Sequence, residues 1–178
     1  IRDLLQFAPE SAGMAAETEL LLFEASRSQL VREIIRPALA NGTVVISDRF
    51  FDSTTIYQGV ARKLEPRVVE MLNAFAVGPD RPDLTFVLDV NVAAARARML
   101  RRVRPVQATD RMEQEPLEFY ERVCEGYREL ARREPARIRL LEGSRTADEI
   151  ELDIWHEVTA RFPQMRGLEK KGDAVRAS

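Results

Sequence analysis

The stretch TVVISDRFFDSTTIYQG, residues 43–59, decides the fold. Its first five residues, 43–47, are mostly apolar and β-branched, which is typical of a buried strand. Asp48 and Arg49 follow this predicted strand directly. Ligands of open α/β sheets bind beyond the carboxyl ends of the strands, so we expect both side chains to meet a substrate. On spacing alone, a helix-capping role for Asp48 and a surface ion pair for Arg49 are equally good interpretations.

Helices and two further strands flank this segment. Apolar residues at steps of three and four predict a long helix over 18–40, which Asn41-Gly42 ends. Buried strands are predicted at 83–90 and 137–143. Further helices are predicted at 53–60, 66–76, 91–103, 117–133 and 147–161. Because strands alternate with helices, we expect an α/β fold, with a parallel sheet and helices on both faces, in a single domain.

The composition is that of an ordinary globular chain. It has 178 residues, 45% of them hydrophobic, and a formal net charge of −2. Binders of nucleic acids or membrane surfaces usually carry a large positive excess, so we expect neither partner. Cys124 is the only cysteine, which favours a reducing cytoplasm, and no run of 18 apolar residues suggests a membrane span.

Two other groups of residues are candidates for a functional site. Phe23 and Arg27 are four residues apart, so they share one helix face and could hold a planar base. Each of them alone is more often a core ring or a solvated helix residue. The segment 101–111, RRVRPVQATDR, predicts an exposed basic loop that could bring positive charge to a phosphoryl group in transfer. Without other information, a solvated charged helix is the slightly favoured interpretation of these arginines.

Taken together, the chain resembles bacterial thymidylate kinases, which phosphorylate dTMP to dTDP with ATP and Mg²⁺. Four segments carry the resemblance, in the family's order and spacing: TELLLFEASRSQLVREIIRPALANG, VVISDRFFDSTTIYQG, NAFAVGPDRPDLTFVLDV and DRMEQEPLEFYERVCEGYRELARREPARI. The Asp-Arg-aromatic motif that begins at Asp48 is the most diagnostic part. The resemblance implies the P-loop nucleoside monophosphate kinase fold over residues 1–163, a disordered tail at 164–178 and a homodimer whose interface includes the helix at 18–40.

The resemblance also implies an acceptor site for dTMP. Phe23 would stack on the thymine ring, Arg27 would bond the edge of the base, and Arg49 would hold the phosphate. Asp48 would lie near Mg²⁺ and the phosphoryl group in transfer. The nucleoside pocket would be lined by Ser53, Thr54, Tyr57 and Gln58, with the bulk of the tyrosine excluding a ribose 2′-hydroxyl.

On the ATP side, the loop 101–111 would be the family's lid. The catalytic arginines expected there are Arg101, Arg104 and Arg111, the first of which would also contact ATP. Glu113 would be a second ligand or hydrogen-bond partner near Mg²⁺. Ser144 and Arg145 follow the last predicted strand and would lie near adenine.

The chain departs from the family in one respect. It contains no Gly-Lys-Ser or Gly-Lys-Thr, so the family's GxxxxGK[ST] phosphate loop is not found. We therefore expect an N-terminally truncated thymidylate kinase, in which the strands at 43–47 and 83–90 do not pair directly. Two alternatives stay open: an inactive relative that keeps only the dTMP site, and a kinase of another deoxynucleotide or deoxynucleoside.

Overall fold

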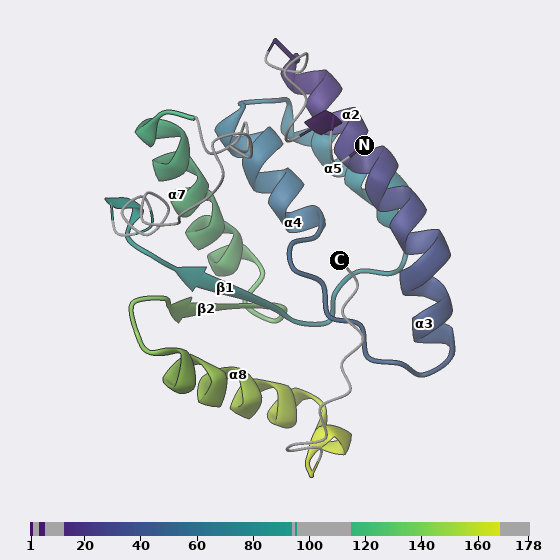
Figure 1. Cartoon of the computed structure of the whole chain (residues 1–178), viewed down its shortest axis with the longest axis vertical. Coiled ribbons are helices and arrows are strands. Elements are labelled where there is room, and N and C mark those ends of the chain that lie inside the picture. Colours follow the sequence, from purple (N-terminus) through teal and green to yellow (C-terminus); the bar gives the residue numbers. More distant parts are fainter. Residues whose placement is uncertain (2–3, 6–12, 94, 96–114, 168–178) are drawn as a thin grey trace.

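The computed structural model describes residues 1, 4–5, 13–93, 95 and 115–167. Two parallel strands, β1 (Thr85–Asp89) and β2 (Ile138–Glu142), lie among the helices (Figure 1). The α-helices are α2 (Ala16–Leu30), α3 (Arg36–Ala40), α4 (Phe51–Thr54), α5 (Pro66–Val77), α7 (Leu117–Arg133) and α8 (Ala147–Arg161). Wider π turns form η2 (Val31–Ile35) and η3 (Thr55–Ala61), and a 3-10 turn forms η5 (Pro163–Met165). In Figure 1, α7 and α8 lie on opposite sides of the strands, as the α/β prediction requires.

The strands confirm two predictions and contradict a third. β1 and β2 fall within the predicted ranges and pair in register from Thr85↔Ile138 to Asp89↔Glu142. The strand predicted at 43–47 is wrong, because this segment is not part of the sheet. A strand needs a neighbour for its N–H and C=O groups, and among the described residues β1 pairs only with β2. The segment therefore stays unpaired from β1, as expected, and leaves Ile46 78% exposed.

The long helix predicted over 18–40 is confirmed, with a π turn near its end. η2 ends two residues before Pro37, which lacks the N–H that the interior of this continuous helix would otherwise use as a donor. The extra residue in a π turn shifts the positions that face the core. As a result Ile35 is buried, whereas Ile34, which continues the apolar spacing four residues after Leu30, is 47% exposed. Gly42 follows the helix with a φ of 73°, as the predicted stop requires.

The other helices match their predictions closely. α7 and α8 have the predicted bounds, and α5 extends the predicted helix by one residue. The helix predicted at 53–60 is present as α4 followed by η3. Most of the helix predicted at 91–103, and the loop 101–111, lie outside the described residues. In the ranges that the structure describes, no helix is both long and apolar enough to cross a membrane.

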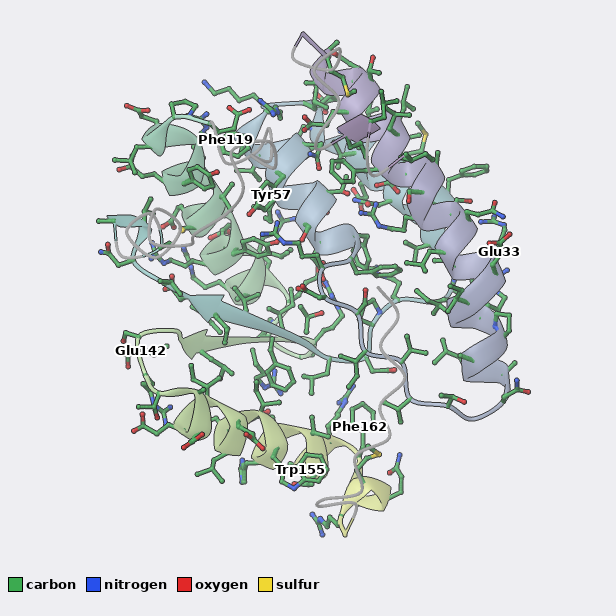
Figure 2. All side chains as sticks on the ribbon, viewed as in Figure 1. Glu33, Tyr57, Phe119, Glu142, Trp155 and Phe162 are labelled. Carbon is green, nitrogen blue, oxygen red and sulfur yellow. The ribbon has the colours of Figure 1, made fainter. Side chains whose placement is uncertain are left out.

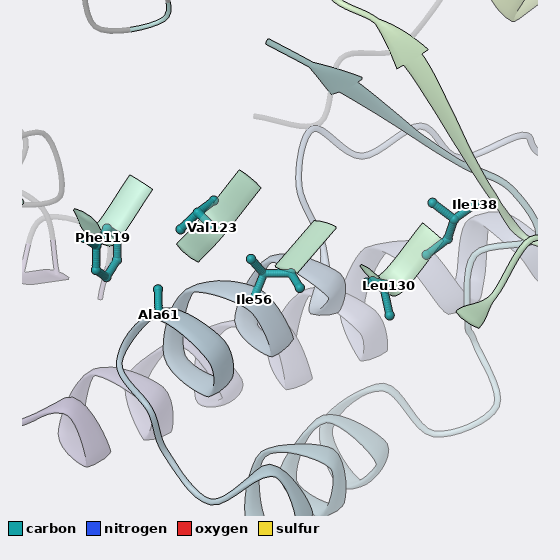
Figure 3. Packing of buried hydrophobic residues seen from close by; sticks show 6 residues of the cluster. All are labelled: Ile56, Ala61, Phe119, Val123, Leu130 and Ile138. Atoms are coloured by element: carbon teal, nitrogen blue, oxygen red, sulfur yellow. The ribbon is translucent and has the colours of Figure 1, made fainter. Parts of the chain in front are cut away.

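The main buried cluster joins η3, α7 and β2 (Figure 3). It consists of Ile56, Ala61, Phe119, Val123, Leu130 and Ile138. Gly126 of α7 permits the close approach, since an added Cβ would come 3.2 Å from Ile56 Cδ1. This packing fixes η3, and with it α4 and the segment around Arg49, against α7.

Candidate functional site

Arg27 joins α2 to α4 and to Phe50, the residue before α4. Its Nη2 donates to Thr54 Oγ1 at 2.7 Å and to the Phe50 carbonyl at 3.5 Å, and its Nη1 donates to Glu24. The guanidinium carbon lies 5.7 Å from the centre of the Phe50 ring. Phe23, expected to share a face with Arg27, is half-buried on the same helix. The structure therefore brings the expected base-binding helix against the segment that follows Asp48.

Arg49 has a backbone conformation that is rare for its residue type. Its φ is 67°, in the left-handed region, where non-glycine residues pay a steric cost and functional residues are enriched. The exposed side chain of Arg49 lies over η3, with its guanidinium carbon 4.9 Å from the centre of the Tyr57 ring. Ser47 Oγ donates to the Arg49 carbonyl at 2.9 Å. Arg49 thus presents an exposed cation beside an aromatic ring, and Asp48 is exposed next to it.

Tyr127 of α7 contacts Ser53 of α4. Its hydroxyl lies 2.9 Å from Ser53 Oγ. Burial raises the pKa of the Tyr127 phenol to about 12, partly offset by the Ser53 hydrogen bond, so the phenol is uncharged at neutral pH and either hydroxyl can donate. The rings of Tyr57 and Phe119 point toward one another, with centroids 5.9 Å apart (Figure 2). Sequence reasoning missed Tyr127, although its four-residue spacing from Val123 places it on the buried face of the predicted helix.

Gln58 lies in a different environment from its predicted companions. It is 2% exposed, and its Nε2 donates to Glu19 Oε1 at 2.7 Å. Glu19 is fully buried and also accepts from Arg62 at 3.2 and 3.1 Å. Arg62 also forms an ion pair with Glu115 at 2.6 Å. Gln58 therefore belongs to an internal network that fastens α2 to η3, a network that the sequence did not reveal.

Asp52 attaches α4 to the sheet. Its carboxylate binds both Nη atoms of Arg137, at 2.7 and 2.8 Å. Thr85 Oγ1, at the beginning of β1, donates to it at 3.4 Å. Such bidentate pairs fix orientation as well as distance. The pair holds α4 to the amino-terminal end of the strands, and sequence reasoning missed it because its partners are 85 residues apart.

The carboxyl ends of the strands carry a second ion pair. Asp89, the last residue of β1, binds Arg128 Nε and Nη2, both at 2.9 Å. Cys124 lies nearby, with its Sγ 3.9 Å from the Val90 carbonyl, and burial raises the pKa of its thiol. The thiol therefore stays protonated at neutral pH, as expected for a packing residue.

The predicted adenine loop also lies at this end of the sheet. Exposed Ser144 donates to Glu142 Oε1 at 2.7 Å, and Arg145 forms an ion pair with Asp153 of α8. Gly143, just before them, donates its N–H to the Asp89 carbonyl at 2.9 Å. Both predicted residues therefore have protein partners, on a loop that is held against the end of β1.

Several predicted site residues cannot be placed. Arg101, Arg104, Arg111 and Glu113 lie outside the described residues. Within the part of the chain that the structure describes, no three His, Cys, Asp or Glu side chains form a metal site. Mg²⁺ in phosphate-transferring enzymes usually takes one or two carboxylates, with phosphates and water as its other ligands. The exposed carboxylate of Asp48 fits that limited role.

Comparison with known proteins gives the family. A family model described as "Thymidylate kinase" matches residues 1–154. The chain belongs to the thymidylate kinase family. This membership confirms the predicted P-loop nucleoside monophosphate kinase fold.

Curated relatives agree with the family model. The thymidylate kinase of Desulforudis audaxviator is 46% identical over 147 residues, which cover 83% of this chain and 64% of that protein. The thymidylate kinase of Geobacter sulfurreducens is 47% identical over 146 residues, covering 81% and 68%. That of Symbiobacterium thermophilum is 42% identical over 156 residues, covering 88% and 71%. The chain thus spans about two thirds of the length of these relatives.

Proposed function

We propose that this chain binds dTMP and acts in its phosphorylation to dTDP, with ATP as the phosphoryl donor. The observation that carries the proposal is the bond of Arg27 to Thr54, because it joins the two halves of the acceptor site expected from the sequence. The names of the related proteins support the same reaction, and they favour an active kinase over an inactive relative.

In this proposal, Arg27 and Arg49 recognise the two ends of dTMP. Arg27 presents N–H donors to the edge of thymine, and Phe23 stacks on its ring. Arg49 is exposed and is already oriented over Tyr57, so it can bind the phosphate without losing a competing carboxylate partner among the described residues. A monophosphate is therefore preferred to the free nucleoside.

The sugar lies between these two ends in the proposed complex. Tyr57 supplies the bulk that excludes a ribose 2′-hydroxyl, and Ser53 lines the nucleoside pocket. Thr54 is only 1% exposed, so it acts through its hydrogen bond to Arg27. The hydroxyl of Ser53 is hydrogen-bonded to the neutral phenol of Tyr127, which holds the Ser53 side chain in place. Gln58 does not contact the nucleoside directly. It supports η3 through its hydrogen bond to Glu19.

The transfer step needs position and positive charge more than acid-base groups. An oxygen of the dTMP phosphate forms a bond to the γ-phosphorus of ATP, while the bond from that phosphorus to the oxygen of ADP breaks. Arg101, Arg104 and Arg111 of the proposed lid supply charge to the phosphoryl oxygens, and Ser144 and Arg145 lie toward adenine. Asp48 and Glu113 would hold Mg²⁺, which would supply positive charge against the phosphates.

The proposal includes a homodimer in the cytoplasm. Val68, Met71 and Phe75 share the outer face of α5 and are 43%, 62% and 76% exposed. Exposed apolar patches of this kind mark protein interaction sites. A second copy of the chain is the partner that family membership favours.

The proposed reaction is tested by ADP formation with ATP, Mg²⁺ and dTMP, compared with dUMP and with thymidine. We expect turnover that depends on dTMP and is slower with dUMP. A preference for thymidine over dTMP would overturn the proposal, because it would leave Arg49 without a phosphate to bind. Failure of a folded sample to bind dTMP would overturn it as well.

A further inference from the structure

Glu24 is a buried carboxylate next to Arg27 on α2. It is 5% exposed and Arg27 is 9% exposed, and the two form an ion pair. Both residues lie on the face of α2 that packs into the molecule, with Leu20 and Val31. A buried cation without a counter-charge is strongly unfavourable, so Glu24 is what permits Arg27 to occupy this place.

The guanidinium of Arg27 is held from two sides. Glu24 accepts from Nη1, while Thr54 Oγ1 and the Phe50 carbonyl accept from Nη2. These bonds lie in different directions around a planar group, so together they fix its rotation as well as its position. For Nε, and for the second N–H of Nη1, no acceptor is found among the described residues. These two N–H groups of Arg27 can therefore donate to a ligand.

The other oxygen of Glu24 is not satisfied by the protein. Oε2 is buried and accepts no hydrogen bond from any described residue. Buried acceptors of this kind are rare in folded proteins, because each costs free energy that an apolar side chain would not. Packing alone therefore does not explain a glutamate at this position.

We propose that Glu24 is a positioning residue that fixes the guanidinium of Arg27 for recognition of the pyrimidine. This inference rests on the proposed function and deepens it, since it concerns the same site. A guanidinium that is already oriented loses less conformational freedom when the base binds, so dTMP binds more tightly. The effect of Glu24 on binding is exerted entirely through Arg27.

The binding test is a double-mutant cycle measured by calorimetric titration of dTMP. We expect Glu24→Gln to weaken dTMP binding about tenfold, since the ion pair with Arg27 becomes a hydrogen bond to an uncharged amide oxygen. In an Arg27→Ala background, the same substitution should change affinity by less than about twofold. Glu17→Gln is the matched control, because Glu17 is exposed on the same helix. Equal effects of Glu24→Gln in both backgrounds would overturn the inference.

A second readout does not require a ligand. Proton and nitrogen resonances of the Arg27 side chain, assigned by their loss in Arg27→Lys, report rotation of the guanidinium. We expect separate, slowly exchanging Nη resonances in the parent protein and averaged ones in Glu24→Gln. Unchanged resonances in Glu24→Gln would overturn the inference whether or not dTMP binds. If the parent fails to bind dTMP while the resonances behave as expected, the proposed function fails and the positioning of Arg27 by Glu24 stands.

Discussion

Arg49 shows how one residue can combine backbone strain with an expected role in binding. Its left-handed φ of 67° is a conformation that glycine adopts without cost. We therefore expect Arg49→Gly to leave the free energy of unfolding unchanged or slightly raised, while dTMP binding weakens at least about tenfold. Thymidine has no phosphate, so its affinity should hardly change. Calorimetric titration of both ligands measures the difference.

Lys63 offers a matched control, because it is a second non-glycine residue with a positive φ, of 61°. Lys63→Gly makes the same backbone change and removes a cation away from the proposed site. Its dTMP affinity should equal that of the parent. An equal loss of affinity in both variants would show that backbone relaxation, rather than the arginine charge, is responsible.

Tyr127 makes the free energy of unfolding fall as the pH becomes alkaline. Its folded pKa of about 12 is above the ordinary value of 10.0. Between these values, the unfolded chain releases the phenolic proton and the folded one keeps it. Stability therefore falls as the pH rises through this range. Urea unfolding across it should show a smaller fall for Tyr127→Phe than for the parent.

Ser53→Ala is the companion variant for this measurement. It removes the same hydrogen bond, worth about 1 kcal/mol, but keeps the buried phenol. We expect it to retain the alkaline loss of stability. If Tyr127→Phe showed the full alkaline loss, the raised pKa of Tyr127 would not be its source.

At the scale of elements, the predictions of helices and strands were most accurate where the residue pattern within one segment determines its structure. Residues 117–133 and 147–161 form helices with the predicted bounds: the first buries an apolar face, and the second begins at a capping box of Thr146 and Glu149. The segment 43–47 has the composition of a strand, yet pairing depends on a neighbour that no local pattern reveals. The shift from Ile34 to Ile35 likewise follows from the π turn, which apolar spacing does not predict.

The same limit applies to the candidate site. Arg27 and Arg49 could be predicted as site residues because each lies in a recognisable segment, and the structure brings their elements together. Glu19 and Gln58 are joined across 39 residues, and Asp52 and Arg137 across 85. Such pairs arise from the packing of distant elements, so one sequence cannot reveal them.

Gly143 provides a test of the junction between the two strands. A Cβ added there would lie 2.5 Å from Val90 Cγ2 and 3.1 Å from the Asp89 carbonyl oxygen. We expect Gly143→Ala to lower the free energy of unfolding by about 1–3 kcal/mol, because β1 and the 143–145 loop must separate. Gly13→Ala is the control, since nothing lies within 4 Å of its added Cβ. Urea denaturation measures both, and equal stabilities would contradict the close contact.

At the scale of the whole molecule, the outer face of α5 is the surface that the proposed homodimer uses. Phe75 is its most exposed apolar residue, at 76%. Phe75→Glu should convert the dimer to a monomer in sedimentation velocity, since a buried unpaired charge is incompatible with an apolar interface. Leu152→Glu alters a comparably exposed residue on α8, 70% exposed, and should leave the mass unchanged. A monomeric parent, or a dimer that survives Phe75→Glu, would contradict this interface.

The central claim is that α2 and the segment from Asp48 to Gln58 form one dTMP site. A crystal structure of this chain with dTMP tests it most directly. We expect thymine beside Phe23, with its edge on Arg27 in the orientation set by Glu24 and Thr54, and the phosphate on Arg49. A complex with dTMP bound elsewhere, for example against Ser144 and Arg145 at the end of the strands, would contradict a dTMP site between α2 and the segment from Asp48 to Gln58.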